Sequence, residues 1–285
     1  MKLKYSRLGA SSRIEYSEWQ RRPCSVGMLA AFLAFLVGSS GGTANGAAMR
    51  ELETDRPDAT ESPVTVDKGH FQLESSFFSF SRDDSGGIRT ETWGIGESNI
   101  KYGLTDAMDL QLIFTPYVRE TVSGGGRKTR VDDFSDLTIR LKQNVWGNDE
   151  GTTALGVMPV VKIPTQTAVS NGRWEGGVVV PFSWRAGERW GFGSQVEVDR
   201  VFDDGEGDME WEISHTAVVG VDVTDRFGIY LEYLGVGGDD QYNSFFSGGM
   251  TFGLSRFVQL DAGTLIGLNE EAEDVTLFTG ISWKF

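Results

Sequence analysis

The sequence is short of several residue types, and each shortage excludes a class of protein. Its single cysteine, Cys24, lies in an N-terminal stretch, so the rest of the chain has no disulfide framework and no thiol chemistry. Only 7 residues are proline, while 37 are glycine and 12% are aromatic, a balance that suits long antiparallel strands joined by tight turns. Beyond the N-terminal stretch, no run approaches the roughly 18 apolar residues of a membrane helix. The net charge of -15 argues against nucleic acid as a partner.

The N-terminal stretch has the order of an export signal. Basic residues come first, an apolar run extends from Val26 to Val37, and small residues follow from Gly38 to Ala44. These are the three parts of a secretory signal peptide. We therefore expect residues 1–48 to be removed on export and residues 49–68 to form a periplasmic N-terminal lead-in. Residues 69–285 are expected to form the folded domain.

The last eleven residues carry the pattern that governs this domain. From Val275 to Phe285, apolar or tolerant side chains fill every second position, and Phe278 is the exception. Period-two alternation predicts a strand with one apolar and one polar face. A terminal strand that closes on an aromatic residue resembles bacterial outer-membrane β-barrel proteins. In that class this strand is also the address read by the barrel-assembly machinery, so Phe285 is a candidate for that contact.

Similar strands recur along the whole domain. Twelve segments are predicted as strands: residues 69–81, 90–103, 108–120, 134–146, 152–164, 175–186, 190–202, 209–223, 226–236, 242–254, 257–267 and 275–285. The connections alternate between short ones and long ones, the latter including residues 82–89 and 121–133. An even strand number with sorted connections predicts an all-β fold: a transmembrane antiparallel β-barrel of about 12 strands in the bacterial outer membrane, surrounded by lipid and lipopolysaccharide. A soluble sandwich would explain the alternation but not the sorting.

Strand parity assigns polar side chains to the lumen, because charges on the other face would be costly in lipid. The candidate lumen residues are Glu74, Arg140, Lys142, Gln195, Glu197, Asp199, Glu212, Asp261 and Lys284. We expect Arg140 and Lys142 to pair with inward acids of other strands, such as Glu74, Glu197, Asp199, Glu212, Glu232 or Asp261. Parity also places Phe78, Phe80 and Phe278 inward, as the only hints of an apolar path. Aromatic residues gather near both strand ends, as interfacial girdles do.

Several stretches resemble a known family. They are Thr54–Pro63 (TDRPDATESP), Gly69–Glu74, Ile100–Asp106, Phe134–Lys142, Val161–Thr165 and Asn171–Trp174. Together they are similar to the outer-membrane "MetA-pathway of phenol degradation" family of transporter-type barrels. Gln166 departs from the resemblance, since a glycine is expected there. The resemblance implies a barrel that passes small molecules, aromatic or apolar ones among them, and it supplies no catalytic residues.

The segment before the first strand is a further candidate site. Asp55, Arg56 and Asp58 either enter the periplasmic mouth as a plug or form an ordered lead-in that pairs with the base of the barrel. No cofactor or metal is expected, because the acidic loops 203–208 and 270–274 lack the EF-hand spacing. These loops are read instead as solvated, or as a rim that meets the divalent ions of lipopolysaccharide.

Three functions follow from the sequence, in descending order of support. The first is a channel for a small-molecule solute, with cations or neutral solutes favoured by the acidic lumen. The second is a closed structural barrel that presents surface loops without transport. The third, remote, is an outer-membrane phospholipase with Ser170 as nucleophile. That class needs a histidine two residues earlier, where Ala168 stands, so the serine lacks its base and no enzyme is predicted.

Overall fold

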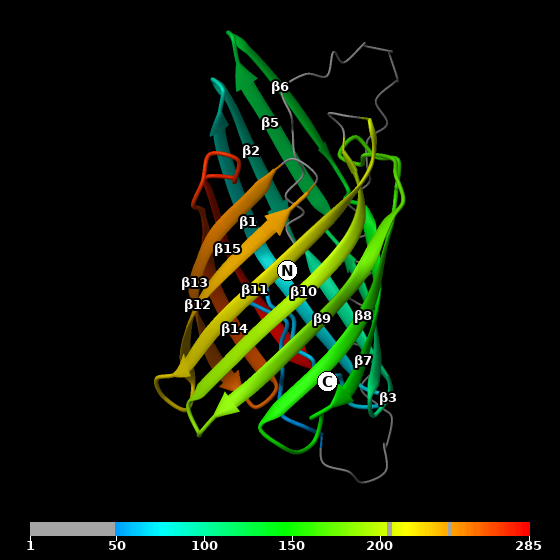
Figure 1. Cartoon of the computed structure of the whole chain (residues 1–285), viewed down its shortest axis with the longest axis vertical. Coiled ribbons are helices and arrows are strands. Elements are labelled where there is room, and N and C mark those ends of the chain that lie inside the picture. Colours follow the sequence, from blue (N-terminus) through cyan, green and yellow to red (C-terminus); the bar gives the residue numbers. More distant parts are fainter. Residues whose placement is uncertain (1–48, 204–206, 239–240) are drawn as a thin grey trace.

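One antiparallel sheet closes on itself through β1 and β15 to form a barrel (Figure 1). The computed structural model describes residues 49–203, 207–238 and 241–285, so the predicted signal peptide 1–48 lies outside the described residues. The strands are β1 Phe71–Ser85, β2 Ile88–Ile95, β3 Ser98–Thr105, β4 Met108–Phe114, β5 Tyr117–Gly124, β6 Arg127–Asp133, β7 Leu137–Trp146, β8 Thr153–Ile163, β9 Glu175–Ala186, β10 Trp190–Asp203, β11 Asp208–Asp222, β12 Phe227–Gly237, β13 Tyr242–Ser255, β14 Val258–Gly267 and β15 Val275–Lys284. Over those same stretches, no helix is long and apolar enough to span a membrane.

The wall has twelve strands because three of them are interrupted. β3 and β2 pair with the lower and upper halves of β1, so together they form one wall strand. β4 and β5 form the next strand, broken at Pro116, and β6 and β7 form the third, broken at residues 134–136. The predicted transmembrane antiparallel barrel of about 12 strands is confirmed.

Two connections predicted as long loops are instead β-hairpins that extend above the barrel. β1 and β2 pair up to Ser85 and Ile88, and β5 and β6 pair up to Gly124 and Arg127. Residues 82–89 and 121–133 are therefore largely strand. Both faces of these extensions meet solvent, so they carry no hydrophobic alternation by which a strand could be detected.

A β-bulge at Phe77 reverses the predicted facing of two phenylalanines. The pairing of β1 with β15 shifts between Ser76 and Phe78, which leaves Phe77 unpaired. One extra residue sends every following side chain to the opposite face. Phe78 and Phe80 therefore point outward, where the Phe80 ring lies 4.7 Å from the ring of Trp93. The prediction that they face the lumen was wrong, whereas Phe278 on β15 is buried inside.

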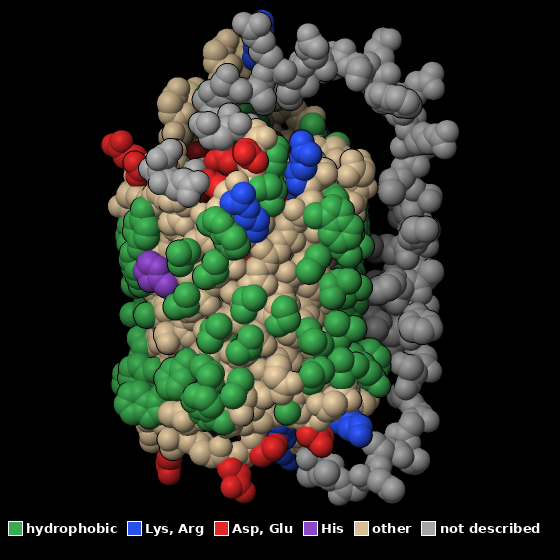
Figure 2. Space-filling model, turned by 45° about the vertical axis from the view of Figure 1, so that its right-hand side comes forward, with side chains coloured by type: hydrophobic (Ala, Val, Ile, Leu, Met, Phe, Trp, Pro, Cys, Tyr) green, Lys and Arg blue, Asp and Glu red, His purple; other side chains and the backbone are tan. Residues whose placement is uncertain are grey.

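On the face drawn in Figure 2, apolar side chains gather along the flank of the barrel and charged ones at its two ends. Side chains such as Val196 and Leu231 are about half exposed there, at 51% and 52% of their surface. Aromatic residues including Trp184, Trp190 and Trp283 are exposed near the short turns. A closed barrel satisfies every wall peptide group internally, and an apolar belt of this kind faces lipid. The protein is accordingly a barrel of the bacterial outer membrane.

The closing seam joins the first strand of the barrel to the last. β15 runs antiparallel to β1 from the Gln72–Lys284 pair to the Arg82–Val275 pair. Beyond it, Phe71 and Phe285 exchange two backbone hydrogen bonds of 2.9 Å. The C-terminal residue therefore completes the ladder at the short-turn end of the barrel.

Candidate functional site

Residues 54–67, here called the inner segment, lie inside the barrel. The chain is fixed at the short-turn end by Arg50, which donates to the carbonyls of Asp106 and Asn148. It then enters the lumen and returns to the same end at Val66, whose backbone N–H donates to Asp109 at 2.9 Å. Asp55 and Glu61 are each only 1% exposed. Polar groups so deeply buried need partners, and the wall supplies them.

Asp55 is held between two lysines of the wall. Its carboxylate accepts from Lys101 of β3 at 2.5 Å and from Lys142 of β7 at 2.7 Å. Glu74 of β1 accepts from the Asp55 backbone N–H at 3.1 Å and also pairs with Lys101. Burial alone would raise the pKa of the Asp55 carboxyl, but the two ammonium groups hold it well below its ordinary value. Asp55 is therefore ionised and fixed to two strands.

Arg56 ties the inner segment to the opposite side of the seam. Its guanidinium donates to both carboxylate oxygens of Asp261 on β14, at 2.6 and 3.0 Å, and to the Ser76 hydroxyl at 2.7 Å. A bidentate pair of this kind fixes orientation as well as position. Arg56 is thus the second anchor of the inner segment.

The tip of the inner segment, residues 59–61, is bound by β10, β11 and β12. Glu232 accepts from the backbone N–H groups of Ala59 and Thr60, each at 2.8 Å, and the Thr60 hydroxyl lies 2.6 Å from that of Thr216. Gln195 accepts from the backbone N–H of Glu61 at 2.8 Å. The tip is therefore fixed to three neighbouring wall strands.

The expected ion pairs among wall residues are replaced by pairs with the inner segment. Arg140 donates to Glu61 at 2.6 Å, and Lys142 pairs with Asp55, so neither contacts the wall acids proposed as its partners. The expectation failed because it searched for partners only among the strands. Lys284 likewise pairs with Asp67, at 3.1 Å.

Three of the predicted lumen residues lie apart from the inner segment. Glu197 is buried on β10 and accepts from the Ser214 hydroxyl at 3.2 Å. Asp199 stands opposite Glu212 in the β10–β11 register, and both are half-buried. These carboxylates extend the acidic surface from the tip toward the long-loop end.

Sequence reasoning missed four residues that hold the inner segment: Glu61, Lys101, Asp109 and Glu232 as its direct partner. Each was visible in part. Lys101 and Asp109 occupy inward positions of predicted strands, and Glu61 lies in a segment rich in charged residues. The missing information was that the segment enters the barrel, which local periodicity does not report.

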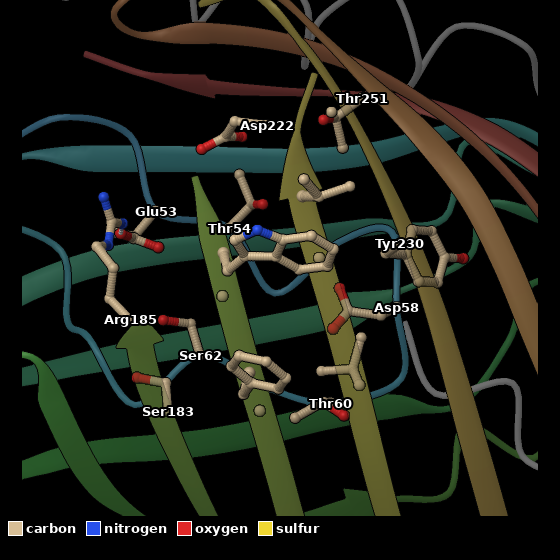
Figure 3. A pocket seen from close by; sticks show the side chains of 18 of the residues that line it. Glu53, Thr54, Asp58, Thr60, Ser62, Ser183, Arg185, Asp222, Tyr230 and Thr251 are labelled. Atoms are coloured by element: carbon tan, nitrogen blue, oxygen red, sulfur yellow. Dashed lines mark hydrogen bonds and ion pairs between the residues drawn. The ribbon is translucent and has the colours of Figure 1, made fainter. Parts of the chain in front are cut away.

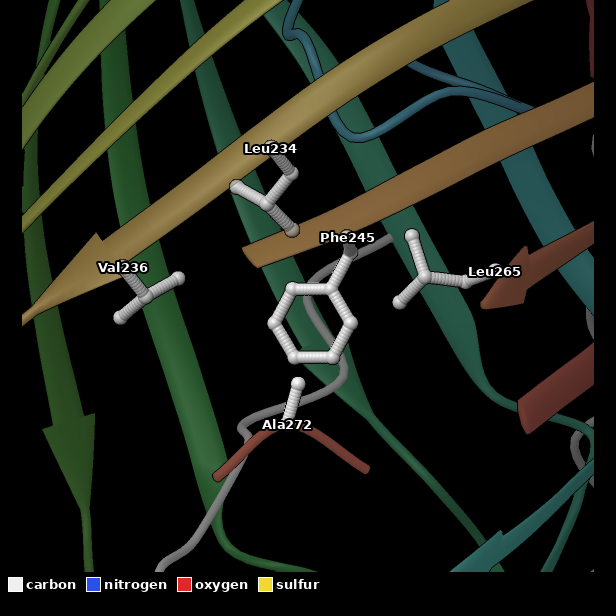
Figure 4. Close-up of a cluster of buried hydrophobic side chains, with 5 residues drawn as sticks. All are labelled: Leu234, Val236, Phe245, Leu265 and Ala272. Atoms are coloured by element: carbon white, nitrogen blue, oxygen red, sulfur yellow. The ribbon is translucent and has the colours of Figure 1, made fainter. Parts of the chain in front are cut away.

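An apolar patch covers the lumen wall near the tip (Figure 4). It consists of Leu234, Val236, Phe245, Leu265 and Ala272, with Ala59 of the inner segment packed against it. Ala272 comes from the connection between β14 and β15, which folds inward and is fixed by hydrogen bonds such as that from the Leu268 N–H to the Ser244 carbonyl at 2.8 Å. The lumen therefore has an apolar side above the tip and a charged side across from it.

The remaining candidate residues contact groups other than one another. Ser170 hydrogen-bonds to Asp136, while His215 faces outward against Tyr233 and Tyr242. In the described stretches, no cluster of histidine, cysteine, aspartate or glutamate is arranged to hold a metal ion. Part of the acidic loop 203–208 lies outside the described residues.

The inner segment and the barrel together cover the same residues as the match to a known family. The family described as "Putative MetA-pathway of phenol degradation" matches residues 54–285, which is the inner segment together with the whole barrel. The chain belongs to this family. Among curated proteins, none matches this MetA-pathway family barrel.

Solved structures resemble this MetA-pathway family barrel in fold. An outer membrane channel from Pseudomonas putida F1 is similar with a TM-score of 0.62 and 16% identity, covering 82% of this chain and 100% of that one. The NanC porin has a TM-score of 0.48 at 9% identity, over 75% of this chain and 100% of its own. The translocator domain of autotransporter NalP from Neisseria meningitidis has a TM-score of 0.48 at 8% identity, over 76% and 89%.

Proposed function

We propose that this protein is an outer-membrane channel for small molecules and that the inner segment is its plug. The observation that carries the proposal is the way in which the lumen is filled. The inner segment within it is a loop separate from the wall, held there by ion pairs and hydrogen bonds. Such a loop can leave without unfolding the barrel. The resemblance in fold to an outer membrane channel agrees with this reading.

The lumen chemistry supports two preferences in the solute. Carboxylates at Glu197, Asp199 and Glu212 favour cations or neutral molecules over anions. The patch around Phe245 offers apolar contact, which suits an aromatic or apolar molecule with a polar group. Both surfaces lie around the tip of the inner segment, where a passing solute would be selected.

Planar-bilayer conductance tests the channel directly. The refolded mature protein is compared with a variant in which residues 55–64 are replaced by a Gly-Ser linker. We expect rare or small openings for the first and a steady, larger and cation-selective current for the second. Arg140→Ala should give an intermediate result because it frees Glu61. Absence of current from every form, at any potential, would overturn the proposal.

The closed structural barrel is the second candidate, and the same ion-pair network favours it. A lumen filled by buried pairs such as Arg56–Asp261 can be permanently sealed. The two candidates differ in the linker variant: a channel conducts once the loop is removed, whereas a structural barrel shows no current or loses its fold.

We also infer that the protein is not a hydrolase. Ser170 has an acidic partner instead of a histidine, and His70 hydrogen-bonds to the Lys68 carbonyl at 3.1 Å near the short-turn end. A serine without a base is a weak nucleophile. A phospholipid hydrolysis assay on the refolded protein tests this, and turnover that is lost in Ser170→Ala would contradict it.

Assembly through the terminal strand is the last part of the proposal. Phe285 continues the β15–β1 seam through its backbone, and its ring lies 4.7 Å from that of Trp283 and 6.0 Å from that of Phe71. In an unfolded precursor this same edge would be free to pair with another strand. We propose that the barrel-assembly machinery reads the strand that ends at Phe285.

A further inference from the structure

A cavity of about 310 Å³ lies between the inner segment and strands β9 to β12 (Figure 3). Asp58, Thr60 and Ser62 line it from the inner segment, and Ser183 and Asp222 line it from the wall. Its rim is formed near the short turns, where Arg185 pairs with Glu53 at 3.3 Å. The volume is at the lower end of the range for small-molecule sites.

Glycines create this cavity, and the backbone does not require them. Gly191 and Gly220 are opposite each other on β10 and β11, and neither adopts a left-handed φ. A Cβ atom built on Gly191 would meet no atom within 4 Å, and one on Gly220 would meet only the Ile229 carbonyl oxygen at 3.8 Å. Side chains would fit at both positions. Because Gly191 and Gly220 have no side chains, the lumen side of the wall keeps free space at these positions.

The inner end of the cavity is closed by the tip of the inner segment. A Cβ atom on Gly193 would lie 3.1 Å from the Thr60 methyl group, so this threonine packs directly against the wall. The cavity is therefore a pocket bounded by the tip at one end and by the short-turn rim at the other. A molecule would reach it from the short-turn side while the inner segment stays in place.

Carboxylates and hydroxyls dominate the lining. Three arginines also line the cavity, Arg56, Arg185 and Arg189, and the first two are engaged by Asp261 and Glu53. Asp58 and Asp222 point their carboxyl groups toward the cavity, among the hydroxyls of Thr54 and Thr251 (Figure 3). Burial and the neighbouring Glu232 carboxylate raise the pKa of Asp58 well above its usual value.

We propose that this pocket binds a small hydroxylated organic cation, such as an amino sugar, from the short-turn side of the barrel. An ammonium group would pair with the Asp58 carboxylate, whose proton is released to solvent on binding, and hydroxyl groups would hydrogen-bond to the threonine and serine side chains. The inference rests on the proposed channel function, and it adds a hydroxylated cation to the aromatic or apolar solutes that the patch around Phe245 suits.

Titration calorimetry of the purified, detergent-solubilised mature protein tests the pocket. Glucosamine, glucose and glucuronate serve as the cationic, neutral and anionic probes of one shape. We expect glucosamine to bind at least about tenfold more tightly than glucose, since one charged hydrogen bond distinguishes them, and glucuronate to give no binding heat. No heat from glucosamine, or equal binding of all three sugars, would overturn the proposal.

Three variants locate the binding. Asp58→Asn should weaken glucosamine about tenfold and leave glucose unchanged. Gly220→Leu should abolish binding because its side chain fills the pocket. Val219→Leu is the matched control, since Val219 neighbours Gly220 but shares the outer face with Phe192, its partner in the ladder. Gly220→Leu that binds like the control would place the sugar elsewhere.

The outcomes separate this inference from the channel itself. Current from the linker variant together with no glucosamine binding would end the pocket proposal and leave the channel intact. Glucosamine binding without any current would keep the pocket and end the channel.

Discussion

At the scale of single residues, the Asp55 carboxylate serves two ammonium groups at once. Asp55→Asn removes the negative charge and leaves one side-chain oxygen, in place of two, to accept from Lys101 and Lys142. Removing one partner of a buried ion pair costs about 3 kcal/mol, which here weakens docking of the inner segment. We expect a clear rise in open probability in planar bilayers.

Asp149→Asn is the matched control for that substitution. Asp149 also pairs with an arginine, Arg50 at 3.2 Å, but its side chain is 70% exposed. Exposed pairs contribute little, so the control should conduct like the wild type. Equal behaviour of both variants would show that the buried pairs do not hold the inner segment.

Asp58 gives docking of the inner segment a pH dependence. Its pKa is raised by burial, by Glu232 and by Glu61, so the docked state favours its protonated form. A raised carboxyl pKa stabilises docking fully below the ordinary value near 3.8, and this stabilisation is lost as pH rises through the elevated pKa. The Asp55 pairs persist over this window, because the pKa of Asp55 is depressed.

Conductance recorded from acid to neutral pH checks this sign. Open probability should increase with pH in the wild type and stay flat in Asp58→Asn. An increase that survives in the variant would assign the titration to another carboxyl, with Glu232 the first to examine.

At the scale of elements, the terminal strand both closes the barrel and ends on the residue proposed to direct assembly. Deleting Phe285 removes two backbone hydrogen bonds to Phe71 and two ring contacts. The other pairs of the β1–β15 seam remain. We therefore expect refolding in detergent to survive, and the amount in the outer membrane of cells to fall several-fold.

Heat-modifiable migration on gels measures the first quantity, and immunoblotting of membrane fractions measures the second. Phe285→Tyr is the control, because it keeps the terminal aromatic ring. If deletion impairs refolding and cellular assembly equally, Phe285 acts through stability alone and not as an address.

The same scale shows how far local pattern predicts this fold. Alternation along β10 placed Gln195 and Glu197 inside and Val196 outside, as their burial shows. It failed at Phe78, because the bulge at Phe77 inserts one unpaired residue and so reverses the face on which the following side chains lie. The alternation of apolar and polar residues does not reveal that insertion. Strand periodicity is a local property, and register across strands is not.

At the scale of the whole molecule, the inner segment is the feature that the sequence predicted least well. Arg56 and Asp261 are 205 positions apart, and Thr60 and Glu232 are 172 apart. No periodicity links such pairs. The charges of Asp55, Arg56 and Glu61 indicated only that the segment needs partners. The closed barrel shows that those partners lie inside it.

The channel proposal requires the inner segment to move, and a disulfide can prevent that movement. The hydroxyls of Thr60 and Thr216 lie 2.6 Å apart, so Thr60→Cys with Thr216→Cys places two thiols within reach of each other. The only natural cysteine, Cys24, belongs to the predicted signal peptide, so no other thiol competes. Oxidation would fasten the tip to β11 without changing the wall.

We expect the oxidised double variant to show no openings and the reduced form of the same sample to regain them. Each single cysteine variant should conduct in both redox states, which controls for the loss of the Thr60 hydrogen bond to Glu232. Reduction also serves as the folding control, because a misfolded barrel would not recover. Current that persists through the locked protein would mean that solutes pass beside the inner segment, and its role as a plug would have to be abandoned.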